Sequence, residues 1–255
     1  MINTRHKSKP SPGVQIDWSH PLAYGLIGFW PLNEGAGKIV NNLAVHPQLG
    51  AITGTAWTGN ALRHSATTDR TALLADSLVP TTNITVSLGY RKTDTTARLA
   101  TAAGIDGVTT TGRCNIHLPY SDNVVYWDFG GVTSGVSRIT AASLTFGDDA
   151  WSFVAGTGGM RIWQNGRQRA TQSGTATRTV FGANWTLGTG AGLGSDLADY
   201  KWVAMHNVPL DAERIQQLHA EPFALMAPQR RIFISLPQIF SRRSTSNRVG
   251  TRTAA

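Results

Sequence analysis

The sequence predicts an all-β fold, an antiparallel β-sandwich of the jelly-roll kind with one short helix near its C-terminal end. Short apolar segments alternate with polar residues and are separated by clusters of turn-forming residues, a pattern typical of many short strands. The 27 glycines suit tight turns between such strands. Only one segment carries the signals that start and stop a helix.

Residues 148–174 give the clearest strand signal. Apolar side chains recur at every second position on both sides of a Gly-rich turn, at Trp151, Phe153, Ala155, Met160 and Ile162. Asn165 and Gly166 then tolerate the positive φ angles of a type I′ turn. We therefore expect three consecutive antiparallel strands here.

The remaining elements follow from the same signals. Further strands are predicted at residues 22–32, 49–57, 60–64, 72–75, 84–91, 99–103, 114–118, 124–129, 138–146 and 185–188. The helix should begin after Asp211, a good N-cap, with Leu210 packing on Ile215 and with Leu218 on the same face. Pro222 should end it.

Charge divides the chain into a body and two terminal segments. Three of the 23 basic residues lie in residues 1–13 and six lie in residues 228–255, and neither segment contains an acid. The residues between them hold 14 basic and 15 acidic side chains. We expect a basic N-terminal arm over residues 1–21, a sandwich over residues 22–222 and an Arg-rich arm over residues 223–255. Solubilising tails would have the same composition.

Three stretches carry a family resemblance. Residues 149–166, with Asp149, Trp151 and the Asn165-Gly166 turn, resemble the central repeat of laminin-G-like, concanavalin-A-like lectin domains. Residues 25–37 look like the first strand of that family, and residues 199–218 look like its last strand and closing helix. The resemblance implies this sandwich fold over residues 22–222, and it implies no particular activity.

A narrower resemblance concerns the C-terminal part. Residues 222–225, Pro-Phe-Ala-Leu, lead into an Arg-rich segment as in laminin-G-like proteins of tailed bacteriophages. The apolar run 232–240 is either a further strand of the sandwich or a strand added to a neighbouring subunit. No run of ~18 apolar residues predicts a membrane span. Residues 1–13 lack the apolar core of a signal peptide, so we expect synthesis in a host cytoplasm.

The residue inventory argues against catalysis. Glycosidases of this fold need paired carboxylates on strands, whereas the three Glu residues lie in a turn, in the helix and beside Pro222. An inverting pair such as Asp122 and Asp128 has little support, because Asp residues in loops typically form turns. The His spacing supports no zinc site. Cys114 lies in an alternating strand and is expected in the core.

The sequence offers candidate residues for a Ca²⁺ site and for a glycan-binding site. Laminin-G-like domains often hold Ca²⁺ at one rim, and Asp148, Asp149 and Asp196 would be the candidate ligands, although no dense acidic cluster exists. We therefore expect no cofactor. Trp57 and Trp127 are candidate platforms for a glycan because they neighbour turn residues, although a Trp in a sandwich is more often part of the core.

The leading hypothesis is a non-enzymatic virion protein of a tailed phage, a capsid decoration or tail-associated module, with a carbohydrate-binding adhesion module as the alternative. Its partners would be other virion proteins, further copies of itself or surface glycans, rather than nucleic acid or a membrane. The residues expected to contact virion partners lie in the two arms: Arg5, Lys7, Lys9, Arg230, Arg231, Ile232, Phe233, Ile234, Arg242, Arg243, Arg248 and Arg252.

Overall fold

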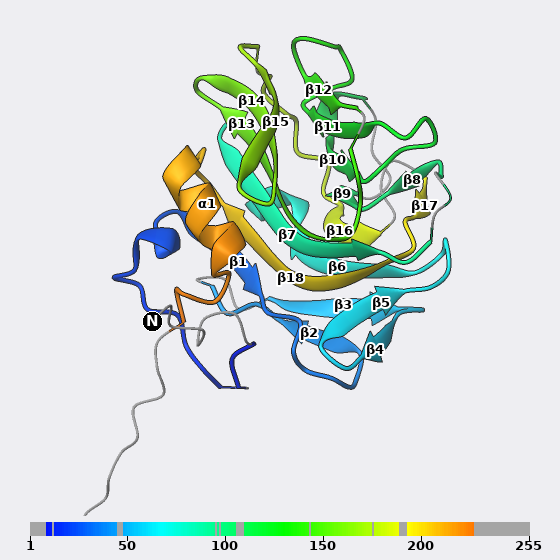
Figure 1. Ribbon diagram of the computed structural model, residues 1–255, viewed down its shortest axis with the longest axis vertical. Coiled ribbons are helices and arrows are strands. Elements are labelled where there is room, and N and C mark those ends of the chain that lie inside the picture. Colours follow the sequence, from blue (N-terminus) through cyan, green and yellow to red (C-terminus); the bar gives the residue numbers. More distant parts are fainter. Residues whose placement is uncertain are drawn as a thin grey trace, which may run out of the picture.

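Two antiparallel β-sheets stack on each other in the computed structural model (Figure 1). The structure describes residues 9–226 except residue 12 and residues 45–47, 95, 97, 106–109, 143, 175 and 189–192. In this part of the chain the predicted β-sandwich is confirmed. No helix of the described residues has the length and apolar character needed to cross a membrane.

The first sheet, which we call the helix-side sheet, has the strand order β15-β14-β13-β7-β18-β5-β4, and β1 also pairs with β18. Its longest strands lie in the middle, where β18 pairs with β7 and β7 pairs with β13. The strands are β1 (Leu26–Trp30), β4 (Ala56–Thr58), β5 (Ala61–His64), β7 (Ile84–Lys92), β13 (Asp148–Gly156), β14 (Gly159–Gln164), β15 (Arg167–Gln172) and β18 (Ala198–His206).

The second sheet, which we call the pocket-side sheet, has the order β12-β11-β10-β9-β16-β6-β3-β2. Its strands are β2 (Ile39–Asn41), β3 (Leu49–Thr53), β6 (Arg70–Ala75), β9 (Ala103–Ile105), β10 (Cys114–His117), β11 (Val125–Phe129), β12 (Arg138–Ala141) and β16 (Asn184–Gly188). The strands β8 (Ala100–Thr101) and β17 (Gly194–Ser195) pair in parallel and form a separate two-stranded sheet. The described residues include three 3-10 turns: η2 (Pro21–Ala23) before β1, η3 (Asp76–Leu78) between β6 and β7, and η4 (Thr110–Gly112) between β9 and β10.

The predicted three-strand meander is β13, β14 and β15. β13 pairs with β14 from Trp151 opposite Gln164 to the Gly-rich turn. Asn165 and Gly166 adopt φ angles of 50° and 74°, the positive values that a type I′ turn requires. β15 therefore folds back on β14, as the sequence predicted.

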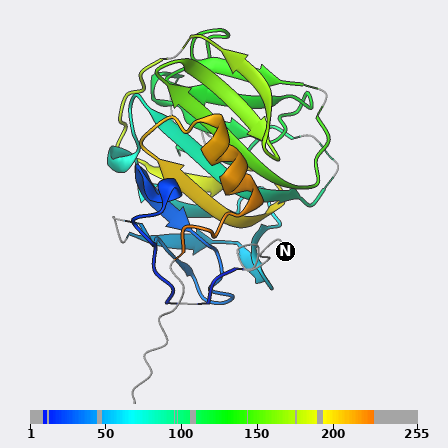
Figure 2. The same ribbon diagram turned by 60° about the vertical axis from the view of Figure 1, so that its left-hand side comes forward.

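The predicted helix is α1 (Ala212–Ala220), which lies on the outer face of the helix-side sheet (Figure 2). The Asp211 side chain accepts a hydrogen bond from the Arg214 amide at 2.9 Å and so caps the helix. Leu210, Ile215 and Leu218 are buried in an apolar cluster with residues of β14 and β18. This cluster holds the helix on the sheet.

The main core fills the space between the two sheets. Its largest fully buried side chains are four tryptophans, Trp30, Trp127, Trp151 and Trp185. Each comes from a different strand, and alternation along that strand directs it inward. The position of Cys114 in this core confirms its predicted place, and burial raises the pKa of its thiol to about 12.

The two ends of the described chain lie together. Ile16 and Met226 form an antiparallel bridge, and the Asp17 amide donates to the Leu225 carbonyl at 2.8 Å. Ile16, Phe223 and Leu225 are buried in the same apolar cluster as α1. The folded body therefore includes residues before position 22 and after position 222, such as Ile16 and Leu225.

Candidate ligand-binding pocket

Two neighbouring strands of the pocket-side sheet present polar side chains on its outer face. Asn115 and His117 alternate with core residues on β10, and Tyr126 and Asp128 do so on β11. The antiparallel register sets Asn115 opposite Asp128 and His117 opposite Tyr126. Four polar or aromatic side chains therefore form one patch.

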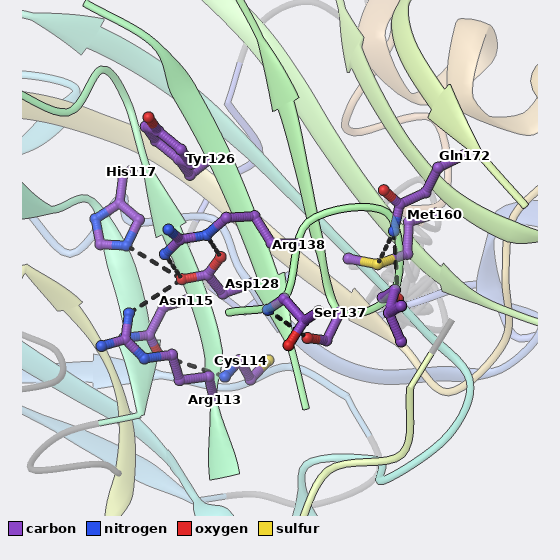
Figure 3. A network of polar contacts seen from close by, with 12 residues as sticks. Arg113, Cys114, Asn115, His117, Tyr126, Asp128, Ser137, Arg138, Met160 and Gln172 are labelled. Carbon is purple, nitrogen blue, oxygen red and sulfur yellow. Dashed lines mark hydrogen bonds and ion pairs between the residues drawn. The ribbon is translucent and has the colours of Figure 1, made fainter. Parts of the chain in front are cut away.

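Asp128 is the centre of a buried ionic cluster (Figure 3). Its cross-strand neighbour on β12, Arg138, donates from Nε to Oδ1 at 2.5 Å and from Nη2 to Oδ2 at 2.6 Å. Arg113, just before β10, donates from Nη1 to Oδ2 at 3.0 Å. His117 Nε2 lies 3.8 Å from the same oxygen. One carboxylate thus orients two guanidinium groups.

The electrostatics of the cluster keep Asp128 ionised. Burial opposes ionisation, but the two hydrogen bonds from Arg138 and the positive charge of its guanidinium outweigh it, so the pKa of Asp128 lies below its usual value. The same hydrogen bond raises the pKa of Arg138. Two positive guanidiniums thus face one negative carboxylate.

Aromatic rings stand beside this cluster. The rings of His117 and Tyr120 pack edge to face with centroids 5.0 Å apart, and those of Tyr120 and Tyr126 do so at 5.7 Å. The guanidinium carbon of Arg138 lies 4.8 Å from the centroid of the Tyr126 ring. These contacts limit the movement of each side chain.

A tight turn between β10 and β11 positions Tyr120. The Tyr120 amide donates to the Val124 carbonyl at 2.9 Å, and Asn123 adopts a φ of 62° within the turn. Asp122 accepts from the Val124 amide at 3.0 Å and from the Tyr126 hydroxyl at 2.5 Å. Asp122 is therefore a turn former, and no pairing with Asp128 for acid–base chemistry is apparent.

The cluster and the rings enclose a pocket of about 310 Å³. This volume lies at the lower end of the range for small-molecule sites. The pocket is lined by two cations, three aromatic rings and two aliphatic side chains: Arg113, Arg138, His117, Tyr120, Tyr126, Val132 and Leu193.

The structure corrects one predicted glycan platform. Trp127 is completely buried in the core, where its Nε1 donates to the Val154 carbonyl at 3.1 Å. A ring without exposed surface cannot stack on a sugar that arrives from solvent. Trp57 lies on β4, partly buried against the core, and its Nε1 donates to the Gly37 carbonyl at 3.0 Å. Trp57 does not line the pocket.

The three Ca²⁺ candidates are engaged separately. Asp148 pairs with Lys201, and Asp149 accepts from the Asn165 side chain at 2.6 Å. Asp196 is buried, pairs with Lys92 at 2.8 Å and accepts a short hydrogen bond from a tyrosine hydroxyl. Among the described residues, no group of three or more His, Cys, Asp or Glu side chains could hold a metal ion.

Most residues predicted to contact virion partners lie outside the described residues: Arg5, Lys7, Arg230, Arg231, Ile232, Phe233, Ile234, Arg242, Arg243, Arg248 and Arg252. Lys9 is described, and its contact with a partner stays a prediction. Its Nζ donates to the Leu32 carbonyl at 2.6 Å, so the side chain rests on the body. Burial lowers the pKa of Lys9 to about 7, against the opposing charge of Glu34.

Two serine–histidine pairs lie outside the pocket in the described part of the chain, His64 with Ser195 and His219 with Ser152, and the second has the geometry to test for a nucleophile. His219 Nδ1 accepts from the Gly166 amide at 2.8 Å, and Nε2 lies 2.7 Å from Ser152 Oγ. The neutral ring must therefore carry its proton on Nε2 and donate it to Ser152. A general base needs the opposite arrangement. Ser152 is also buried, so the pair is structural.

Sequence reasoning missed five of the pocket residues: Arg113, His117, Tyr120, Tyr126 and Arg138. A usable signal was present in residues 114–129, where polar or aromatic side chains alternate with core residues on two strands joined by a short turn. That pattern predicts a polar outer face. It does not predict that Arg138 joins the face, because this depends on the pairing of β11 with β12.

No protein-family profile matches the chain, and no curated protein matches it significantly. Solved structures do match. Trypanosoma rangeli sialidase in complex with sialic acid superposes with a TM-score of 0.56 and 12% identity, over 80% of this chain and 34% of the sialidase. The chain thus spans about a third of the sialidase.

Two further structures have similar scores. Domain 4 of AbnA, a GH43 extracellular arabinanase from Geobacillus stearothermophilus, was solved in complex with arabinotriose. It matches with a TM-score of 0.59 and 13% identity, over 76% of this chain and 98% of the domain.

The binding domain of botulinum neurotoxin DC, in complex with rat synaptotagmin II, matches with a TM-score of 0.56 and 12% identity, over 77% and 51% of the two chains. At such low identity these similarities show the fold alone. The chain is therefore an antiparallel β-sandwich, similar in fold to part of a sialidase, to one domain of an arabinanase and to the binding domain of a toxin.

Proposed function

We propose that this chain is a non-catalytic carbohydrate-binding module and that a sugar binds in the pocket between Arg113, Tyr120 and Arg138. The observation that carries the proposal is the composition of the pocket, in which three aromatic rings stand beside two guanidiniums fixed by a buried carboxylate. Aromatic rings give apolar contact to the C–H faces of sugars, and fixed donors bind their oxygens.

The structural neighbours support a binding role. The AbnA domain was solved in complex with arabinotriose, and the toxin domain was solved in complex with rat synaptotagmin II. Each of these complexes pairs a domain of similar fold with a bound partner. For the present chain, the alternative of catalysis has no support in the pocket, whose lining contains no carboxylate that could act as acid, base or nucleophile.

A glycan array probed with the full chain tests this function. We expect binding to a defined group of oligosaccharides, and we expect Tyr120→Ala to reduce it by about tenfold, since ring–ligand contacts contribute ~1–3 kcal/mol in binding sites. The matched control is Tyr24→Ala, because Tyr24 is exposed near α1 and outside the pocket. Unchanged binding by the Tyr120 variant would contradict the assignment of the site.

We also propose that the module is carried on a tailed-phage particle by its two basic terminal segments. The supporting observation is the position of the ends. Ile16 and Met226 are bridged on the side of the helix-side sheet that carries α1, whereas the pocket-lining side chains of β10 and β11 lie on the outer face of the other sheet. Segments leaving from this point would leave the pocket free to face outward.

Deleting residues 230–255 tests the attachment separately from sugar binding. The deletion removes six arginines and none of the residues that line the pocket. We expect the truncated chain to fold and to bind glycans like the full chain, yet to be lost from purified particles. If the truncated chain were incorporated into particles at the normal level, attachment through the C-terminal segment would be refuted. If the full chain were absent from the proteins of purified particles, the virion role would be refuted.

A further inference from the structure

The pocket has an unbalanced set of charges. Its lining includes two arginines and no carboxylate, and Asp128, which lies beneath it, is completely buried. Asp128 neutralises one of the two guanidiniums, so the other positive charge has no counter-charge in the lining. Asp122 lies outside the lining at the adjacent turn, where it is exposed and accepts from the Tyr126 hydroxyl. Its charge interacts with Arg138 across solvent, where salt weakens the attraction.

The hydrogen-bonding groups of the two arginines that remain for a ligand are all donors. Arg138 uses Nε and Nη2 for Asp128, and Arg113 uses Nη1, which leaves Arg138 Nη1 and Arg113 Nη2 for a ligand. Arg113 Nε is buried and has no partner among the described residues. The same holds for Nδ2 of Asn115, the cross-strand neighbour of Asp128. Guanidinium groups have no acceptor to offer.

A donor-rich pocket of this kind selects a ligand that brings acceptors and negative charge. The planar fork of arginine fits the two oxygens of a carboxylate, and hydrogen bonds to a charged acceptor are stronger than neutral ones. The three aromatic rings beside the arginines would meanwhile contact the sugar ring. We infer that the pocket recognises an acidic saccharide whose carboxylate binds Arg113 and Arg138, an inference that rests on the proposed carbohydrate-binding function.

An array with neutral, carboxylate-bearing and sulfated oligosaccharides tests this inference with the full chain. We expect the strongest signals on carboxylate-bearing sugars. Methyl esterification of the carboxylate in the best ligand should weaken its binding by about tenfold, equivalent to ~1.4 kcal/mol. Binding of the free acid should also weaken as NaCl is raised, because salt screens charges at a partly exposed site.

Arg113→Gln is the informative variant. Arg138 keeps both of its hydrogen bonds to Asp128, so the carboxylate stays paired. We expect the preference for the free acid over the ester to fall from about tenfold to about twofold. Arg113→Lys should restore part of this preference, because lysine carries the positive charge but lacks the planar pair of donors of the guanidinium. Arg167→Gln, at an exposed position of β15, is the control and should keep the full preference.

The possible outcomes separate the two proposals. Equal binding of acid and ester, or signals confined to neutral or sulfated sugars, would overturn the acidic-saccharide inference and leave the carbohydrate-binding function standing. A folded chain that binds no glycan on the array would overturn both. A preference for the acid that survives Arg113→Gln with unchanged magnitude would also overturn the inference, since the uncompensated charge would then play no part.

Discussion

Arg138 holds Asp128 by two parallel hydrogen bonds from adjacent strands, and this pair fixes the floor of the pocket. The carboxylate is fully buried, whereas about a quarter of the Arg138 side chain remains exposed, 26%. The arginine can therefore be oriented by the protein and still contact a ligand. We therefore expect both the affinity for a ligand and the free energy of unfolding to depend on the Asp128 carboxylate.

Asp128→Asn should destabilise the protein. The substitution keeps the shape but leaves two guanidiniums without their counter-charge. Removing one partner of a buried pair costs ~3–5 kcal/mol, and because Arg113 and Arg138 are partly exposed we expect about 2–3 kcal/mol. Urea denaturation at neutral pH measures the loss. Asp122→Asn is the control and should cost less than ~1 kcal/mol, because its carboxylate is exposed. Equal losses would contradict the buried role of Asp128.

Arg178 and Asp76 form a second ion pair in which neither side chain is exposed. Asp76 also accepts from the Phe181 amide at 2.6 Å, so the pair ties residues 178–181 to η3. We expect Asp76→Ala and Arg178→Met each to reduce the free energy of unfolding by ~3–5 kcal/mol, because each leaves a buried charge alone.

The double variant provides the check on this pair. Removing both charges leaves no uncompensated ion, so the double substitution should cost clearly less than the sum of the two single losses. Urea denaturation of the three variants measures the coupling. Additive losses would mean that the two side chains act independently, which would contradict the ion pair.

Stability should fall as the pH drops from about 6.5 to about 4. Burial lowers the pKa of His64, His206 and His219 from 6.5 to about 4. Above this range each ring is neutral in the folded and unfolded states and contributes nothing. Within it the unfolded chain takes up protons that the folded chain refuses, so the free energy of unfolding decreases. Below about pH 4 both states are protonated and this contribution stops changing.

The expected slope is at most ~1.4 kcal/mol per pH unit for each histidine. Urea denaturation at pH 7, 6 and 5 measures it. His206→Gln should flatten the dependence by about a third, since one of the three rings is removed while the amide can still donate to the Leu22 carbonyl that His206 Nε2 contacts at 2.9 Å. A free energy of unfolding that stays constant from pH 7 to pH 5 would contradict this expectation. It would mean that the buried rings take up protons as readily in the folded chain as in the unfolded chain.

Local signals predicted most of the sandwich, because strand alternation, the Asn165-Gly166 turn and the Asp211 cap are encoded by neighbouring residues. Trp127 was assigned wrongly on local grounds. Its nearness to a turn suggested exposure, yet in residues 125–129 the large apolar side chains share its parity, which directs Trp127 to the core. Parity, rather than distance from a turn, decides which face a strand residue occupies.

The pocket could not be predicted in the same way. It depends on β12 pairing with β11, which brings Arg138 opposite Asp128, and on the turn that returns Tyr120 toward His117. The packing of the terminal residues is equally non-local, because the bridged residues Ile16 and Met226 lie at opposite ends of the described chain. Such contacts join residues far apart in the sequence, where no local pattern records them.

Ser152 should be unreactive toward a fluorophosphonate probe, because His219 donates to it rather than accepting its proton. Burial lowers the pKa of His219 to about 4, so the ring is neutral near pH 7 with its proton on Nε2. Nitrogen NMR should show this tautomer. Ser152→Ala should cost ~1–2 kcal/mol, because it removes the hydroxyl that lies 2.6 Å from Ser87 Oγ and 2.7 Å from His219. If the probe labelled the protein but not its Ser152→Ala variant, Ser152 would be reactive and the expectation would be wrong. A proton found on Nδ1 of His219 would contradict the expectation in the same way.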